Sequence, residues 1–278
     1  MKKGIWISKG ILILALIIGI HTKSYTQKYE GSIINKISKK PVEYVNIGVV
    51  GKNIGTVCNS KGIFEITLNS DFDNEILAFS CIGYQSITMK VKDFKALSSK
   101  IIYFTEKTVN LKQVEIKPKQ FKQKTLGYTT QTKMAVAGFK ENKLGYELGI
   151  MMDCKKSAII EKVNFNIADC TYDSIFFRLN IYEVDKNDNY SNILKHPIYI
   201  SFSKAQVKNK ITVDLTKENI ITNGDFLVSL EQVKDLGPGS LNFCCSLIGK
   251  THYIETSQGK WDTVPVGISI SVEAKVEK

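Results

Sequence analysis

Few residues in this chain have types and spacing that could do chemistry, and the first to test is a His-x-x-Glu pair. His252 and Glu255 have the spacing of a zinc-binding pair. Catalytic zinc needs three protein ligands and an open position. Residues 251–255 have the composition of a strand, in which side chains three apart point to opposite faces. The one other histidine beyond the N-terminal segment, His196, lies upstream, so we predict no metal site.

Nucleophile and phosphate-binding motifs are also missing from the sequence. There is no Gly-x-Ser-x-Gly and no Cys-x-x-Cys, and Gly237-Pro-Gly239 is a turn without the Gly-Lys-Ser/Thr of a phosphate loop. We therefore expect no catalytic residue, no cofactor and no enzymatic activity. Paired carboxylates leave no sequence signature, so a glycosidase-type site stays open as a weaker alternative.

Six cysteines could form disulfides in an exported chain. They are too sparse for a disulfide scaffold, and each half of the chain is long enough for an ordinary core. We expect buried free thiols, with disulfides as the alternative.

A polar face on two expected strands is the first candidate binding surface. Arg178, Asn180 and Tyr182 alternate with apolar residues, and Ser229 and Glu231 do the same further along the chain. Planar donors and acceptors beside an aromatic ring suit sugar hydroxyls and a sugar face. The alternative is a solvated outer face with an Arg178–Glu231 salt bridge of little consequence.

Trp261 is the second candidate, together with its neighbour Lys260. Trp6 lies in the N-terminal apolar segment, and Trp261 is the only other tryptophan. It follows a polar, turn-like run, so we place it on a loop, where binding residues concentrate. An indole there would give a sugar ring a flat face, with Lys260 and Asp262 beside it. The alternative is a ring that folds back to cap the core.

The elements that position these residues are short runs rich in β-branched and aromatic residues, separated by turn signals. In the first half, Gly55 and the quartet Asn59-Ser-Lys-Gly62 set two hairpins around a shared segment. The strands we expect there are 29–35, 45–50, 55–58, 63–68, 75–82, 85–91 and 100–104. Such a series predicts an all-β sandwich.

The segment 31–91 resembles the carboxypeptidase-regulatory-like domain, a transthyretin-like sandwich common in exported proteins of Bacteroidetes-type bacteria. The residues that carry the resemblance are Gly31, Pro41-Val42, Val45-Asn46, Gly55-Thr56, Gly62, Phe64, Ser80 and Ile82-Gly-Tyr84. One departure is Cys58-Asn59, where the family has Thr-Asp, so Asn59 must cap its turn alone. The resemblance implies an accessory module that does not itself cleave.

The second half predicts a larger sandwich. Eight or nine strand candidates lie between residues 144 and 274 without a long helix, separated by turns such as Thr222-Asn-Gly224. This pattern favours a jelly-roll-like sandwich over 128–278. Between the halves, the four lysines of 117–124 beside a proline predict a solvated linker over 117–127.

The N-terminus has the features of a signal peptide. Lys2 and Lys3 precede the apolar run 11–20, which is shorter than the ~20 residues of a membrane span. We expect a cleaved signal peptide over 1–26 and no integral span afterwards, with an uncleaved anchor as the alternative.

The net charge of +11 comes almost entirely from scattered lysines, because Arg178 is the only arginine. Nucleic-acid binding is therefore not expected. The ordinary explanation of such a charge is that the lysines are simply solvated. The functional explanation is that they bind acidic polysaccharide or membrane surfaces.

The sequence thus predicts an exported all-β protein: a transthyretin-like or Ig-like sandwich over 27–116, a linker, and a jelly-roll-like sandwich. We expect it to be periplasmic, outer-membrane associated or secreted. The leading function is binding of a carbohydrate or cell-surface polymer by the second domain, through Arg178, Asn180, Tyr182, Glu231, Lys260 and Trp261. The alternative is a structural or assembly protein of the cell envelope that contacts an envelope protein.

Overall fold

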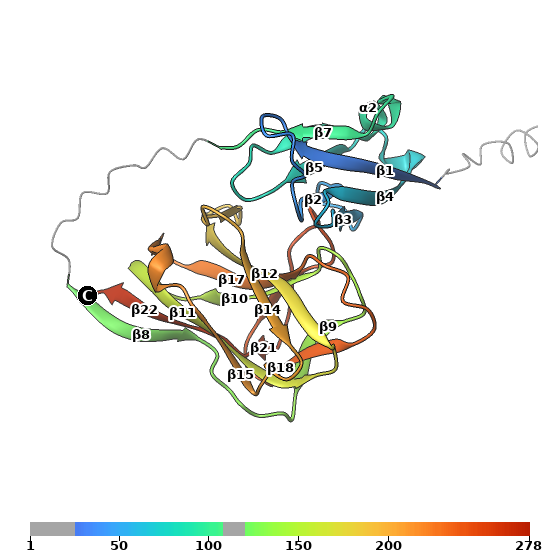
Figure 1. The fold of residues 1–278 in the computed structure, drawn as a ribbon. Coiled ribbons are helices and arrows are strands. Elements are labelled where there is room, and N and C mark those ends of the chain that lie inside the picture. The colour runs from blue at the N-terminus through green and yellow to red at the C-terminus, as the bar shows by residue number, and fades with distance from the viewer. Residues whose placement is uncertain (1–25, 108–119) are drawn as a thin grey trace, which may run out of the picture.

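A computed structural model describes residues 26–107 and 120–278, and strands make up nearly all of its regular structure (Figure 1). The strands form two sandwiches, one over residues 26–107 and a larger one over 120–278. The expected all-β fold class is confirmed. Nearly all of the expected signal peptide, and residues 117–119 of the expected linker, lie outside the described residues.

The first sandwich has a three-stranded and a four-stranded sheet. In the first, β1 (Thr26–Asn35) lies between β4 (Ile63–Asn69), antiparallel to it, and β7 (Ile101–Phe104), parallel to it. The second has the order β3 (Gly55–Val57), β2 (Asn46–Val49), β5 (Ile76–Ser80), β6 (Ile87–Lys90). A 3-10 turn (Ser70–Phe72) and the helix α2 (Val91–Ala96) complete this domain.

The turn at residues 59–62 forms as its sequence predicts. The side-chain Oδ1 of Asn59 accepts hydrogen bonds from the backbone N–H of Lys61 at 2.9 Å and of Ile63 at 3.0 Å. Gly62 has φ +71°, which a residue with a Cβ rarely adopts. Cys58 does not cap the turn, because its sulfur receives the Val45 N–H from within the core. Asn59 therefore caps the turn alone.

The second sandwich packs a seven-stranded sheet on an eight-stranded sheet. The seven-stranded sheet contains β10 (Glu147–Met152), β12 (Ser174–Val184), β13 (Tyr190–Asn192), β14 (Ile198–Ser203), β17 (Phe226–Gln232), β19 (Thr251–Ile254) and β20 (Asp262–Val264). The eight-stranded sheet contains β8 (Phe121–Gly127), β9 (Val136–Lys140), β11 (Ser157–Cys170), β15 (Lys210–Asp214), β16 (Ile220–Asn223), β18 (Ser240–Ser246), β21 (Gly267–Ile268) and β22 (Ile270–Glu277).

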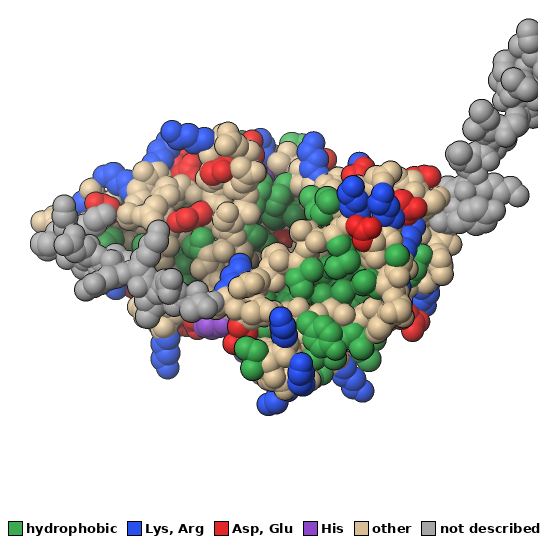
Figure 2. All heavy atoms as spheres, turned by 90° about the horizontal axis from the view of Figure 1, so that it is seen from above, with side chains coloured by type: hydrophobic (Ala, Val, Ile, Leu, Met, Phe, Trp, Pro, Cys, Tyr) green, Lys and Arg blue, Asp and Glu red, His purple; other side chains and the backbone are tan. Residues whose placement is uncertain are grey.

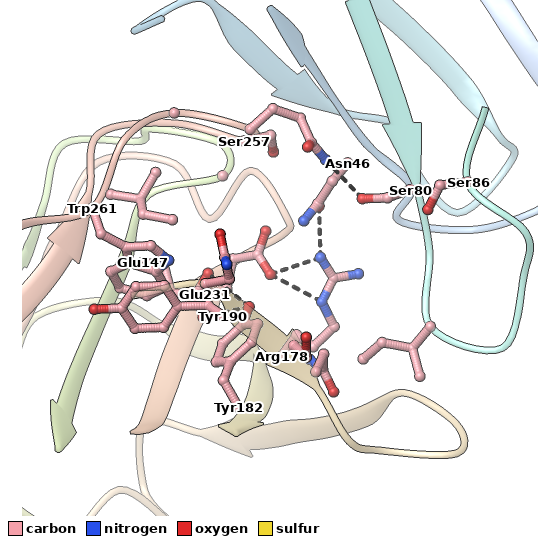
Figure 3. Close-up of a pocket in the computed structure, with 18 of the residues that line it drawn as sticks. Asn46, Ser80, Ser86, Glu147, Arg178, Tyr182, Tyr190, Glu231, Ser257 and Trp261 are labelled. Atoms are coloured by element: carbon pink, nitrogen blue, oxygen red, sulfur yellow. Dashed lines mark hydrogen bonds and ion pairs between the residues drawn. The ribbon is translucent and has the colours of Figure 1, made fainter. Parts of the chain in front are cut away.

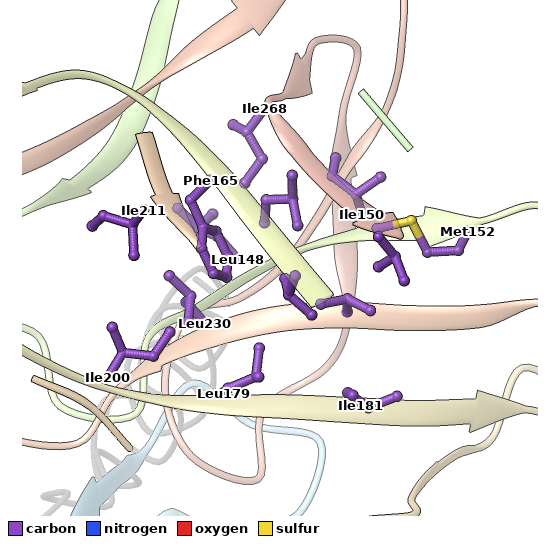
Figure 4. Close-up of a cluster of buried hydrophobic side chains, with 14 of the residues drawn as sticks. Leu148, Ile150, Met152, Phe165, Leu179, Ile181, Ile200, Ile211, Leu230 and Ile268 are labelled. Carbon is purple, nitrogen blue, oxygen red and sulfur yellow. The ribbon is translucent and has the colours of Figure 1, made fainter. Parts of the chain in front are cut away.

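The core of this domain fills the space between its two sheets (Figure 4). Leu148, Leu179 and Leu230 reach into it from β10, β12 and β17, and Phe165 meets them from β11. The alternate residues of β10, β12 and β17 therefore point away from the core. The face they form lies beneath the first domain.

Most of the predicted linker that the structure describes is a strand. Residues 121–127 form strand β8, which pairs antiparallel with β22 from Glu277 to Ser271. Most side chains of β8 are exposed, which explains why its composition resembles a linker. An edge strand with lysines on its open side needs few apolar residues.

On the face that Figure 2 shows, the lysines are scattered and do not form one stripe. Among the described residues, no helix is both long and apolar enough to cross a bilayer.

The six cysteines, all in the described ranges, are free thiols. Burial raises the pKa of Cys58 to about 12, so its thiolate is scarce at neutral pH. We expect reducing agent to leave the melting temperature unchanged, because a native disulfide would contribute about 2–4 kcal/mol. Thermal melts with and without reductant test this, and a clear drop on reduction would contradict it.

Candidate functional site

Three neighbouring strands place two carboxylates and a guanidinium in one row. In the antiparallel register, Glu147 on β10 is opposite Glu231 on β17, and Glu231 is opposite Arg178 on β12. All three side chains lie on the face turned away from the core, and at most 3% of each residue is exposed. Charged groups are almost never buried to this degree unless they are paired.

Arg178 joins the two domains. Its Nε and Nη2 donate to Glu231 Oε2 at 3.0 and 2.7 Å within the second domain. Nη1 donates to the carbonyl of Tyr44 at 2.7 Å. Nη2 donates to Asn46 Oδ1 at 2.6 Å (Figure 3). Both acceptors are in the first domain. Burial, the largest effect, lowers the pKa of Arg178, but the charge and hydrogen bonds of Glu231, together with Cys81 and Tyr199, outweigh it and raise that pKa. The guanidinium therefore stays charged.

An apolar contact surrounds this interaction. The ring of Tyr44 lies 5.1 Å from that of Phe176 and 5.3 Å from that of Tyr199, measured between centroids. Tyr44 has φ +50°, a strained conformation for an aromatic residue. The same residue thus gives its carbonyl to Arg178 and packs its ring against the second domain.

Glycines allow a loop of the second domain to approach the first closely. A Cβ on Gly48 would lie 2.1 Å from the carbonyl oxygen of Ser257, and one on Gly55 would lie 2.3 Å from the same atom. Beside them, Gln258 Nε2 donates to Ser80 Oγ at 2.7 Å. Loop 256–259 is thereby held against β2, β3 and β5.

Glu147 is the carboxylate whose protonation the site perturbs most. Its Oε1 accepts from Asn180 Nδ2 at 2.9 Å, from Tyr182 OH at 3.0 Å and from Ser229 Oγ. Burial, and then the charge of Glu231, raise the pKa of Glu147 to about 7, against the lowering effect of these hydrogen bonds. The amide of Asn180 also donates to Glu231 Oε2 at 2.9 Å, so one NH₂ group bridges both carboxylates.

An open cleft of about 1270 Å³ lies over this row, with walls from both domains. Ser80, Gly83 and Ser86 line it from the first domain, and Glu147 and Glu231 lie on the second-domain side (Figure 3). The cleft is large enough for a ligand of several rings.

An aromatic pair forms one side of the cleft. The rings of Tyr190 and Trp261 lie 4.9 Å apart with their planes 31° from parallel, and Tyr182 meets Trp261 edge-on at 5.9 Å. Tyr190 OH lies 3.4 Å from His252 Nδ1. Trp261 is half-buried, so it is neither a fully solvated platform nor a sealed cap.

Two polar atoms at the cleft are buried without a partner. Glu231 Oε1 and Ser257 Oγ have no hydrogen-bond partner, although both residues line the cleft. A buried polar atom without a partner costs roughly 1–3 kcal/mol. Such atoms are usually satisfied by an ordered water or a ligand.

Five of the six residues expected to bind line this cleft: Arg178, Tyr182, Glu231, Lys260 and Trp261. The sixth, Asn180, lies beneath and holds the carboxylates. The alternative of a solvated outer face is wrong, because the first domain covers much of this polar face. Its Arg178–Glu231 pair is buried and not a surface salt bridge.

Sequence reasoning missed Glu147, Tyr190 and the wall from the first domain. Alternation with Leu148 and Ile150 could have placed Glu147 on the polar face, but strand pairing was needed to put it opposite Glu231. His252 and Glu255 do not converge, since Glu255 pairs with Lys143. The described residues contain no cluster of three or more side chains suited to a metal ion.

A protein-family model matches residues 29–116, and its description is CarboxypepD_reg-like domain. The first sandwich is a CarboxypepD_reg-like domain. The match ends before β8, so it says nothing about the second sandwich. The wall that Ser80, Gly83 and Ser86 give to the cleft thus belongs to the CarboxypepD_reg-like domain.

Other comparisons add little. No curated protein is similar enough to match. A solved structure of the infectious bursal disease virus VP2 subviral particle aligns with 91% of this chain at 10% identity and a TM-score of 0.20. The chain covers 64% of that structure's length. A similarity this low supports no argument about fold or function.

Removing the Arg178 guanidinium should destabilise the protein strongly. In Arg178→Gln, Glu231 stays buried without its cation, and the bonds to the CarboxypepD_reg-like domain are lost. We expect a cost of about 3–5 kcal/mol in the free energy of unfolding, measured by denaturant titration.

The matched control for Arg178 is Lys28→Gln, which breaks the exposed ion pair of Lys28 with Glu65. This change should alter stability little, because exposed pairs contribute little. Equal effects of the two substitutions would show that the Arg178 contacts are not structural.

Glu147 should make stability depend on pH in a defined direction. Its folded-state pKa is raised, so its contribution is full below about pH 4.5 and is lost as pH rises through about 7. The unfolding free energy of the native protein, minus that of Glu147→Gln, should therefore fall across this window. Denaturant titrations at several pH values measure the difference.

Glu161→Gln is the control for this pH series. A hydrogen bond from Lys275 lowers the pKa of Glu161 below its ordinary value, so it titrates beneath the same window. Its difference curve should stay flat from pH 4.5 to 7. A flat or rising curve for Glu147 would contradict the burial of that carboxyl.

Proposed function

We propose that this protein is a non-catalytic carbohydrate-binding protein whose site is the cleft between its two domains. The support is a combination of features that sugars need: an aromatic pair at one side of the cleft, and two polar atoms without partners among its lining residues. Pyranose rings pack their C–H faces on indole and phenol rings, and their hydroxyls satisfy carboxylate and hydroxyl groups.

The unpartnered Glu231 Oε1 is the observation that carries the proposal most directly. Its carboxylate is oriented by Arg178 and Asn180 through the other oxygen, Oε2. Oε1 is thus fixed in place with its accepting capacity unused. A ligand hydroxyl could donate to it after a small displacement of the cleft lining, since the atom is buried in the unliganded arrangement.

Hydrolysis of a glycosidic bond is a second candidate, favoured by two carboxylates that share the Asn180 amide. A retaining glycosidase places its carboxyl groups about 5–5.5 Å apart. The hydrogen bonds at Glu147 argue against it. Glu147 accepts from Ser229, Asn180 and Tyr182, so its oxygens are occupied where a general acid would need one free to face the substrate. Release of reducing ends from a bound polysaccharide would favour hydrolysis.

The alternative function, in which no glycan is bound, is that of a structural or assembly protein of the cell envelope that contacts another protein. That alternative gives no role to the aromatic pair or to the unpartnered atoms. Export to the periplasm, outer membrane or medium is part of our proposal, because it is where a polysaccharide-binding protein meets its ligand.

Trp261 should report binding directly. It is the only tryptophan among the described residues, so the intrinsic emission of a chain without its N-terminal segment comes from this ring alone. We expect a change in its emission and reduced acrylamide quenching when a bound glycan is added. Trp261→Ala should weaken binding at least about tenfold, as loss of a central tryptophan does elsewhere.

Tyr103→Ala is the matched control, since this ring is 49% exposed on β7, away from the cleft. It should leave binding unchanged. A glycan screen with no bound sugar, or a Trp261→Ala variant that binds normally, would refute the proposed function.

A further inference from the structure

Four lysines line the cleft without an acidic partner. Lys107, Lys195, Lys250 and Lys260 are all exposed lining residues. None of them forms an ion pair with another described residue. Elsewhere, surface lysines such as Lys28 and Lys275 do pair with glutamates.

Two of these lysines come from facing domains. The backbone N–H of Lys107 donates to the carbonyl of Gly83 at 2.8 Å, which places Lys107 beside that turn of the first domain. A Cβ on Gly83 would lie 3.5 Å from the carbonyl of Lys195 in the second domain. Lys107 and Lys195 therefore flank the place where the two domains meet.

The other two lysines lie on the side of the cleft that holds the aromatic pair. Lys260 directly precedes Trp261, and Lys250 directly precedes strand β19, which contains His252. Burial, and then the charge of Lys250, lower the pKa of His252. This side of the cleft is thus electropositive without a charged histidine.

Acidic groups do not balance these charges. Among the residues that the structure describes, Asp188 is the one exposed acid that lines the cleft. The charge of Glu231 is neutralised by Arg178. Glu147 is buried and receives hydrogen bonds from three side chains. The accessible rim is therefore positive, while its base presents acceptors to hydroxyl groups.

We propose that the cleft selects anionic polysaccharides, whose carboxylate or sulfate groups reach the four rim lysines while an uncharged part of the ring packs on Tyr190 and Trp261. This inference rests on the proposed carbohydrate binding and adds the ligand class. Uronate and sulfate groups share the chemistry that a lysine recognises, a localised anion accepting from an ammonium.

The test compares matched glycans on the full chain. The probes are uronate oligosaccharides of several linkages, the same oligosaccharides after reduction of each carboxyl to an alcohol, and sulfated galactans. We expect the acidic members to bind about tenfold or more tightly than the reduced ones, as a sum of several exposed ion pairs. Added salt should weaken the acidic binding, because exposed charges are screened. The uronate and sulfate arms distinguish the two anions.

Two variants with the same net charge distinguish the effect of the cleft lysines from the effect of net charge. The cleft variant changes Lys107, Lys195, Lys250 and Lys260 to glutamine, and the control changes four exposed lysines outside the cleft, Lys92, Lys204, Lys208 and Lys210. The cleft variant should lose the preference for acidic glycans, and the control should keep it. Equal binding of acidic and reduced glycans, or equal loss in both variants, overturns this inference and leaves carbohydrate binding standing. Binding of no glycan at all overturns the proposed function itself.

Discussion

A single buried guanidinium links the two domains of this protein. Arg178 is 2% exposed, and such a charge is tolerated only when anions or dipoles surround it. Glu231 supplies the anion from one domain, and Tyr44 and Asn46 supply oxygens from the other. Removing one partner of a buried pair leaves an uncompensated charge, so Arg178 is stable only in an arrangement that supplies its anion and its oxygen acceptors. The requirement to satisfy Arg178 therefore selects the relative position of the two domains, and with it the shape of the cleft.

The chemistry of the cleft follows from that position. Two hydrogen bonds from Arg178 orient Glu231, and the Asn180 amide bridges Glu231 and Glu147. With the CarboxypepD_reg-like domain in place, the polar face of β10, β12 and β17 becomes the base of a cleft. The aromatic pair and the lysines then stand at its rim. The first domain forms one wall of the cleft, a larger part than the accessory module that its family resemblance implied.

Local patterns predicted what local physics determines. Alternation in Phe177-Arg-Leu-Asn-Ile181 was enough to place Arg178 and Asn180 on one face, because strand side chains alternate with a period of two. The Asn59 turn likewise formed as its residues dictate. The partners of those faces could not be predicted. That Glu147 lies opposite Glu231 depends on strand pairing, and that Tyr44 covers Arg178 depends on contacts between residues more than a hundred positions apart. The lysines of β8 led to an incorrect linker prediction. An edge strand needs few apolar residues, so its composition resembles that of a linker.

The central claim is that both domains bind one ligand in a shared cleft. Hydrogen exchange of the full chain, with and without a saturating bound oligosaccharide, tests it most directly. If both domains bind the ligand, backbone amides on both walls should become more protected from exchange. These are residues 80–86 of the first domain and residues 188–195 and 250–261 of the second. Protection confined to one domain would contradict the claim.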